Sequence, residues 1–190
     1  SDLHITVRHL ATHTSGIVDS SDATDFASRE NSPVALADHL RGLLTPEGKL
    51  YDAGAHYLKA EPGTAREYSN LGAGVAGAVA EAVGGAPLRD LARDNIFVPL
   101  AMSNSSWTLD DFLPTTLATR YEVRQCIPFI GVCATSVEPV ANYLINAVFN
   151  PPERYKRFEP YPQYRSLNYP DGGVYSSARD LATLTLAILD

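Results

Sequence analysis

The chain has 190 residues, of which 45% are hydrophobic and 19% charged, a composition typical of one globular domain with a hydrophobic core. Its formal net charge is −7 and its 15 Lys and Arg residues are spread along the sequence, which argues against a nucleic-acid surface. No apolar run approaches the length that a helix needs to cross a bilayer, so we expect neither a nucleic-acid partner nor a membrane span.

The first 44 residues predict two helices separated by a polar loop. Residues 5–13 form a short amphipathic segment with Thr6 as its N-cap, ended by a Thr-Ser-Gly sequence. Residues 19–32 are crowded with Ser, Asp, Thr and Asn and predict a loop. In residues 33–44 a serine cap precedes Pro33 at the first helical position, and leucines supply an apolar stripe.

His9 and His13 are four residues apart, which places them on one face of the first predicted helix. A zinc site needs a further ligand, and the metalloprotease motif needs a Glu where this chain has Leu10. We therefore interpret both histidines as surface or hydrogen-bonded side chains.

Three polar residues, Tyr68-Ser69-Asn70, lie between a Pro-Gly turn at 62–63 and an Ala-rich helix predicted over 71–83. Residues 48–60 before them predict a loop or a short extended stretch, and Gly84-Gly85 predict a left-handed stop to the helix. Polar groups in such a turn are accessible to a substrate. From the residues alone, a helix cap at Ser69 or Asn70 and a packed aromatic at Tyr68 are the favoured explanation.

Gly72, Gly74 and Gly77 match the G-x-G-x-x-G fingerprint of dinucleotide-binding folds. That fingerprint requires a buried strand directly before its first glycine, and the preceding residues here form a polar turn. We interpret the glycines instead as positions where another part of the backbone approaches the helix closely.

The second half of the chain is less regular until its end. A helix begins at Pro87 and runs to Phe97, and short helical turns are expected after Trp107. Residues 150–170 carry many prolines and tyrosines and predict an ordered surface excursion. A turn at 171–173 then leads to a helix over 178–189.

Cys126 and Cys133 are the two cysteines of the chain. Their spacing allows a small disulfide loop in an exported protein, and it allows two buried thiols equally well. A zinc set is disfavoured because no Cys-x-x-Cys pair or nearby histidine completes it. We favour the bridge and, with it, a secreted or periplasmic location.

Four stretches together resemble the serine β-lactamase and penicillin-binding protein family, in its class C and DD-peptidase-like branch with related esterases. The stretch that contains Tyr68-Ser69-Asn70 is the most specific, because it matches the Tyr-x-Asn element of that family. The resemblance implies an α+β fold of the β-lactamase/DD-peptidase type, with this chain covering mainly the helical part and lacking most of the antiparallel sheet. Residues 1–190 then form the central portion of a single domain that is cut at both ends. The four stretches are residues 5–16, 62–72, 95–102 and 171–182.

Two elements of the family pattern are missing from this chain. The nucleophile motif Ser-x-x-Lys lies upstream of the first stretch in the family, and none of Lys49, Lys59 and Lys156 has a serine three residues before it. The Lys/His-Thr/Ser-Gly strand motif belongs downstream of the last helix. His13-Thr14-Ser15-Gly16 imitates it in letters but stands at the family's helix-and-turn position. The resemblance implies a nucleophile outside this chain.

The resemblance further implies a serine-dependent acyl hydrolase of β-lactamase, DD-peptidase or esterase type, acting on a small-molecule or peptide acyl substrate without cofactor or metal. Tyr68 is then the catalytic base, and Asn70 is the partner of the lysine and of the substrate. A phenol has a pKa of about 10, and a helix N-terminus contributes only about 0.3–1 kcal/mol to an exposed anion, so the base needs that lysine. The alternative is a catalytically inactive binding or scaffold protein on the same fold.

Overall fold

The computed structural model describes residues 4–20, 34–127, 130, 133–134, 144–145, 147–148, 156–161 and 167–189. The chain divides into two compact units, each considered by itself below. The helical unit comprises Ser1–Phe112 and Tyr164–Asp190, and the hairpin unit comprises Leu113–Gln163.

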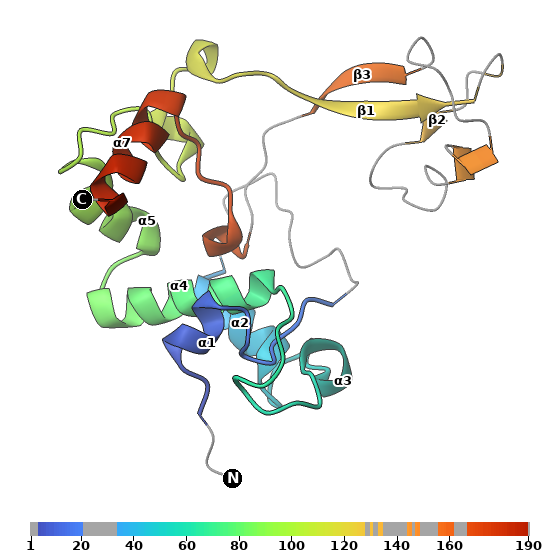
Figure 1. The fold of residues 1–190 in the computed structure, drawn as a ribbon, viewed down its shortest axis with the longest axis vertical. Coiled ribbons are helices and arrows are strands. Elements are labelled where there is room, and N and C mark those ends of the chain that lie inside the picture. Colours follow the sequence, from blue (N-terminus) through green and yellow to red (C-terminus); the bar gives the residue numbers. More distant parts are fainter. Residues whose placement is uncertain are drawn as a thin grey trace. The chain divides into compact units, whose positions relative to one another are not determined.

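Short helices make up the described part of the helical unit (Figure 1). The helix that positions the Tyr68-Ser69-Asn70 stretch is α4, and the others pack around it or follow it. The elements are α1 (Val7–Ala11), α2 (Leu36–Leu44), α3 (Ala53–His56), α4 (Asn70–Gly84), α5 (Leu88–Ala92), the π-helical turn η2 (Arg93–Phe97), the 3-10 turns η3 (Leu109–Asp111) and η6 (Tyr169–Asp171), and α7 (Ala178–Leu189).

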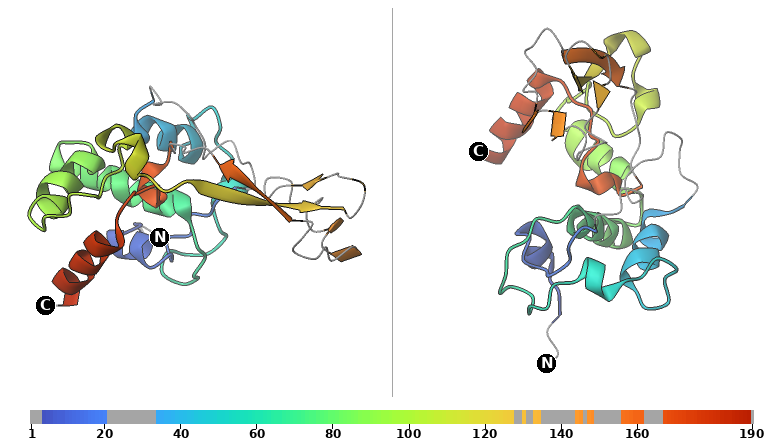
Figure 2. Two further views of the ribbon diagram at one scale, coloured as in Figure 1. Left: turned by 90° about the horizontal axis from the view of Figure 1, so that it is seen from above. Right: turned by 90° about the vertical axis from the view of Figure 1, so that its right-hand side faces the viewer.

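Helix α4 lies at the centre of this unit. Helices α1 and α2 pack on one side of it and the turn η6 on the other, as the right-hand view of Figure 2 shows. Leu71, in the first turn of α4, is fully buried in a cluster with leucines of α1 and α2. Burial of one such side chain stabilises a fold by about 1.5–3 kcal/mol. The start of α4 is therefore held by the core itself.

The glycines of α4 are explained by packing. A Cβ atom added to Gly74 would lie 1.7 Å from Oδ1 of Asn168, and one added to Gly77 would lie 2.4 Å from Cγ of Pro170. Both contacts are far shorter than any real Cβ makes, so only glycine fits where η6 crosses the helix. The prediction of close approach is confirmed, although side chains rather than backbone make the contact.

The termini of α4 agree with the sequence. The Oγ of Ser69 accepts a hydrogen bond of 2.8 Å from the Gly72 amide, which makes it the N-cap. Gly85 adopts a φ of 69° and ends the helix in the left-handed conformation. The predicted left-handed stop at Gly84-Gly85 is thus confirmed.

Other expectations need correction. Helix α2 begins at Leu36, because Ala35 is its N-cap and makes no side-chain bond; the serine and Pro33 lie outside the described residues. The stretch 48–60 contains α3, which Asp52 caps by accepting from two amides.

The two spaced histidines also differ from expectation. His13 lies beyond the end of α1 with a φ of 56°, so it does not share a helix face with His9. His9 instead completes a capping box, its Nδ1 accepting from the amide of Thr6. Their interpretation as hydrogen-bonded side chains is confirmed.

A second, smaller core joins the C-terminal helix to η2. Ala92, Phe97 and Met102 are buried together, and Leu184 of α7 packs against them. The predicted helix over 178–189 is confirmed as α7.

The buried side chain of Asp180 fastens the start of α7 to the preceding loop. It accepts hydrogen bonds of 2.8 Å from the Asn104 amide and the Ser105 hydroxyl. Burial alone raises the pKa of this carboxyl, but the bonds from Ser105 and Asn104 outweigh it and lower the pKa.

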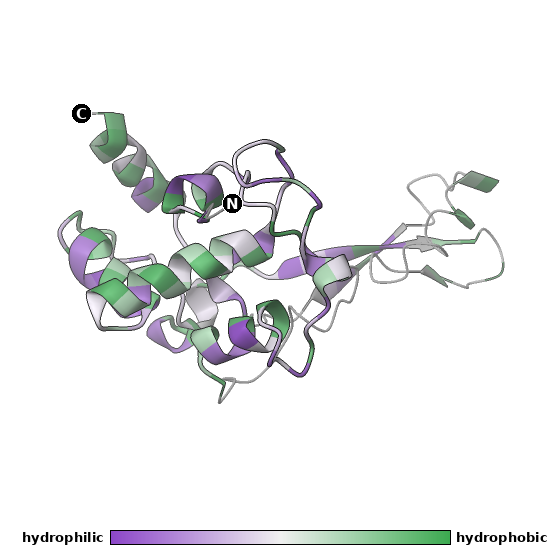
Figure 3. Ribbon diagram, turned by 90° about the horizontal axis from the view of Figure 1, so that it is seen from below, coloured by the Kyte–Doolittle hydropathy of each residue, from purple (hydrophilic) through white to green (hydrophobic). Residues whose placement is uncertain are grey.

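Helix α7 carries many hydrophobic residues, most of them toward its C-terminal end (Figure 3), and several of their side chains are exposed. Leu181, Leu186, Ile188 and Leu189 are between 52% and 77% exposed. In the described part of the chain no single helix is long and apolar enough to cross a membrane; one pair, Asn70–Gly84 with Leu88–Phe97, passes by length and composition together and is bent by 74°.

The hairpin unit holds a three-stranded antiparallel sheet in the order β2-β1-β3, made of β1 (Arg120–Cys126), β2 (Cys133–Ala134) and β3 (Lys156–Tyr161), preceded by the 3-10 turn η4 (Pro114–Thr116). Cys126 and Cys133 are directly opposed in β1 and β2 and form a disulfide, which decides between the two alternatives left open by the sequence. Arg124 pairs with Glu159 of β3 at 2.9 Å. Most of the excursion predicted over 150–170 lies outside the described residues.

Candidate active site

The polar stretch before α4 presents its side chains alternately outward and inward. Tyr68 is 59% exposed, Ser69 is only 1% exposed, and Asn70 is partly buried. This alternation follows from extended backbone at Ser69, which lets its hydroxyl turn back to cap the helix. The two residues predicted to act in catalysis are thereby presented on either side of the cap.

Tyr68 and Asn70 are in direct contact. The Tyr68 hydroxyl donates a hydrogen bond of 2.9 Å to Oδ1 of Asn70. A phenol that donates is in its neutral form, so the pair is arranged as a protonated tyrosine with an amide acceptor. The sequence brought these residues together only by adjacency, and the structure adds the bond between their side chains.

His13 contacts two residues of the same turn. Its ring lies 4.6 Å from the Tyr68 ring, centroid to centroid, and its Nδ1 accepts a hydrogen bond of 3.3 Å from the Ser69 amide. Because Nδ1 accepts, the neutral imidazole carries its proton on Nε2. The sequence analysis gave His13 no partner in this site.

Asp19 is the residue that sequence reasoning missed. Its Oδ1 accepts from the Leu71 amide at 2.9 Å and from the Ser69 hydroxyl at 3.2 Å. Its Oδ2 accepts from the backbone amide of Asn70 at 2.9 Å and from Nδ2 of the same residue at 2.8 Å. A carboxylate at a helix N-terminus is electrostatically favourable. No periodicity links position 19 to position 70, and a single Asp at the edge of a polar loop carries no signal of its own.

A buried amide supports the site from the η6 side. Asn168 is fully buried and donates from Nδ2 to the backbone oxygen of Asn70 at 2.8 Å and to Oδ2 of Asp171 at 3.3 Å. Burial raises the pKa of Asp171 to about 6, against the lowering effect of the Asn168 bond and with a further increase from the negative charge of Asp19. The sequence analysis did not single out either residue.

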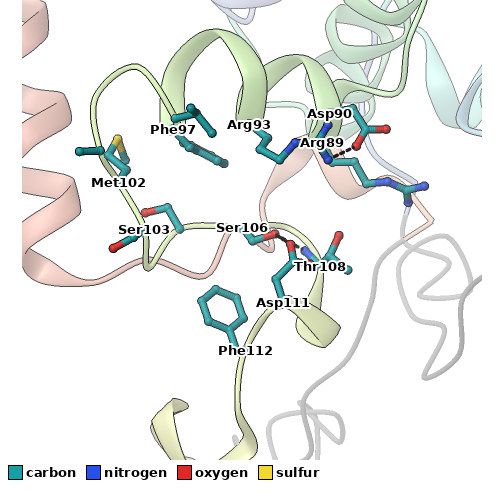
Figure 4. Close-up of a pocket in the computed structure, with 13 residues that line it drawn as sticks. Arg89, Asp90, Arg93, Phe97, Met102, Ser103, Ser106, Thr108, Asp111 and Phe112 are labelled. Atoms are coloured by element: carbon teal, nitrogen blue, oxygen red, sulfur yellow. Dashed lines mark hydrogen bonds and ion pairs between the residues drawn. The ribbon is translucent and has the colours of Figure 1, made fainter.

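A cavity of about 380 Å³ lies elsewhere in the helical unit, between α5, η2 and residues 98–112 (Figure 4). Among the charged residues that line it, Arg93 binds Asp90 at 2.8 Å, and Asp111 accepts a hydrogen bond from Ser106. The described residues that line it include no His or Lys beside its serines.

No group of three or more His, Cys, Asp or Glu side chains in the described ranges is placed to hold a metal ion. The turn before α4 thus contains a phenol, an amide, an imidazole and a carboxylate in hydrogen-bonded contact. These groups can transfer a proton and bind a carbonyl or an ammonium group, but they include no activated nucleophile.

A profile of the Beta-lactamase family matches residues 1–190, the whole of this sequence. The chain belongs to the Beta-lactamase family. The family resemblance of its four stretches is therefore confirmed, and so is the fold class predicted from it.

The fold is similar to that of several solved structures. A penicillin-binding protein from Bacillus halodurans is 25% identical with a TM-score of 0.59, over 97% of this chain and 46% of that one. A D-amino acid amidase from Ochrobactrum anthropi SV3 is 21% identical with a TM-score of 0.60, over 97% and 44%. A class C β-lactamase is 17% identical with a TM-score of 0.54, over 95% and 36%. This member of the Beta-lactamase family thus spans less than half the length of these structures. No curated protein sequence matches it significantly.

Proposed function

We propose that the protein containing this chain is a serine-dependent acyl hydrolase that works through an acyl-enzyme, with its nucleophile in a Ser-x-x-Lys motif outside residues 1–190. Tyr68 is the base and Asn70 the partner of the motif lysine and of the substrate. The proposal extends to residues 1–190 being the central, mostly helical portion of a single domain. The observation that carries it is the 2.9 Å hydrogen bond between the exposed Tyr68 and Asn70 at the start of α4.

The chemistry assigned to each side chain follows from its hydrogen-bonding capacity. In acylation the serine oxygen attacks the acyl carbon, and the serine proton passes to the Tyr68 oxygen in its phenolate form. The bond from the acyl carbon to the leaving nitrogen or oxygen then breaks, and that atom takes up the proton from Tyr68. Water hydrolyses the resulting acyl-enzyme and restores the serine. The motif lysine supplies the positive charge that stabilises this phenolate. The Asn70 carbonyl oxygen accepts from that ammonium, while its amide N–H donates to a carbonyl of the substrate.

The substrate class is a compound with a cleavable acyl bond: a β-lactam, a peptide or amide, or an ester. Relatives named as an amidase, a β-lactamase and a penicillin-binding protein support this range. The second candidate function is a catalytically inactive binding or scaffold protein. It holds if the full-length protein has no Ser-x-x-Lys motif outside residues 1–190.

The test is covalent labelling of the full-length protein with a fluorescent penicillin and with a fluorophosphonate. Labelling is expected in the unaltered protein and should slow by at least about 100-fold in Tyr68→Phe, as removal of a general base does. Tyr121→Phe is the matched control, because Tyr121 is 58% exposed and lies in the hairpin unit. Equal labelling of Tyr68→Phe and the unaltered protein refutes the base assignment; no labelling by either probe favours the inactive alternative.

A further inference from the structure

Asp19 contacts the first turn of α4 at four points, and one of them differs from the rest. Three bonds, from the amides of Asn70 and Leu71 and from the Ser69 hydroxyl, belong to the helix start. The fourth comes from the side chain of Asn70, whose Nδ2 donates to Oδ2 at 2.8 Å. A helix cap needs only the backbone bonds, so the side-chain bond requires a separate explanation.

That fourth bond determines the orientation of the Asn70 side-chain amide. A carboxylate only accepts hydrogen bonds, so the NH2 end of the amide must face Asp19. The reversed amide would place two oxygens 2.8 Å apart in a partly buried site, where repulsion is strong. With Nδ2 held by Asp19, Oδ1 is directed at the Tyr68 hydroxyl, where it accepts at 2.9 Å.

The fixed orientation determines what Asn70 offers to other partners. A carboxamide has two N–H groups and two oxygen lone pairs. Asp19 takes one N–H and Tyr68 takes one lone pair. One N–H and one lone pair remain, and both lie in the amide plane in directions that the two bonds fix.

We propose that Asp19 is a positioning residue that acts through Asn70. Asp19 holds the Asn70 amide in one orientation, in which the amide oxygen faces Tyr68 and the motif lysine and the second N–H faces the substrate. This inference rests on the function proposed above. Preorganised hydrogen-bond groups of this kind lower the barrier because they need no reorientation in the transition state. Removal of the lock leaves the amide free to turn its N–H toward Tyr68.

The first test measures the lock without any activity. The side-chain amide protons of Asn70 are assigned by NMR from the signals that Asn70→Ala loses. Their exchange with solvent should be at least tenfold slower in the unaltered full-length protein than in its Asp19→Asn variant. Asp38→Asn is the control, because Asp38 is an exposed residue paired with Arg41 on α2. Equally fast exchange in the unaltered protein and Asp19→Asn overturns the proposal.

The second test is a double-mutant cycle on the rate of acylation by the fluorescent probes. Asp19→Asn should slow acylation at least tenfold in the unaltered background and less than threefold in the Asn70→Ala background. An equal slowing in both backgrounds means that Asp19 acts only as a helix cap, and overturns the proposal. If no probe labels the unaltered protein, the proposed function fails by itself, and amide exchange still decides the orientation.

A reciprocal exchange keeps the test decisive if Asp19→Asn folds poorly. Asn70→Asp alone sets two carboxylates against each other and should lower the melting temperature. The pair Asp19→Asn with Asn70→Asp restores one donor and one acceptor and should recover most of that loss. A double variant that is no more stable than Asn70→Asp contradicts the direct side-chain contact.

Discussion

Gly74 is the position where one methyl group has the clearest predicted effect. In Gly74→Ala the new Cβ would lie 1.7 Å from Oδ1 and 2.7 Å from Cγ of Asn168, whose side chain is fully buried. Asn168 must therefore move, and it gives up its bonds to the Asn70 oxygen and to Asp171. The predicted effect combines this loss with the strain of an overfilled interior.

The magnitude follows from three terms. Each lost hydrogen bond costs about 1 kcal/mol, and overpacking costs about 1–3 kcal/mol. Alanine in place of glycine inside a helix returns about 1 kcal/mol. The net expectation for Gly74→Ala is a loss of about 2–4 kcal/mol in the free energy of unfolding, measured in urea on the full-length protein.

Gly42→Ala on α2 is the matched control. A Cβ at Gly42 has no neighbouring atom within 4 Å, so this variant gains the helix propensity without the clash. It should be more stable than the unaltered protein by up to about 1 kcal/mol. If both variants gain stability alike, the close packing of η6 on α4 is wrong.

Three further predictions concern ionisation and the disulfide. Burial raises the pKa of Asp171 to about 6, so the contribution of this carboxyl to the free energy of unfolding is full below about pH 4 and is lost as the pH rises through 6. Asp171→Asn should therefore stabilise the protein by about 1 kcal/mol at pH 8 and by nothing at pH 4. Equal stabilisation at both pH values would contradict the raised pKa. Tyr169→Phe removes the hydroxyl that donates to Glu81 and should lower the unfolding free energy by about 1–2 kcal/mol. The pKa of Tyr169 is raised mainly by burial and further by its hydrogen bond to Glu81. The difference in unfolding free energy between the unaltered protein and Tyr169→Phe should therefore narrow above about pH 10. A difference that does not change with pH argues against the Tyr169–Glu81 hydrogen bond. Replacement of Cys126 and Cys133 by serine removes a bridge between residues with a sequence separation of 7. The free energy of unfolding should fall by about 2 kcal/mol, and limited proteolysis within residues 113–163 should become faster. Unchanged cleavage would contradict a stabilising bridge.

Local chemistry made the helix ends predictable from the sequence. Thr6 and Gly85 act as the caps that their residue types favour, and Thr45 ends α2 directly before a proline. These decisions depend on residues within one turn of each other. Helix α3 escaped prediction because four residues are too few to show a period, although its Asp52 cap was visible in the sequence.

Only half of the candidate site was predictable, because its other half comes from residues far away in the sequence. Tyr68 and Asn70 were found because a family pattern names adjacent residues. Asp19 and Asn168 reach the same turn from separations of 51 and 98 residues, which no local pattern encodes. Long-range hydrogen bonds of this kind are visible only once the fold has brought the segments together.

The inward turn of Ser69, between the exposed Tyr68 and the partly buried Asn70, has a consequence for mutational scanning. A selection for cellular abundance reports folding, and a selection for turnover reports chemistry. Position 69 should tolerate few residues in the first selection, because the buried hydroxyl caps α4. Position 68 should tolerate many residues in the first and few in the second. Libraries that aim to change substrate preference should therefore keep both positions constant.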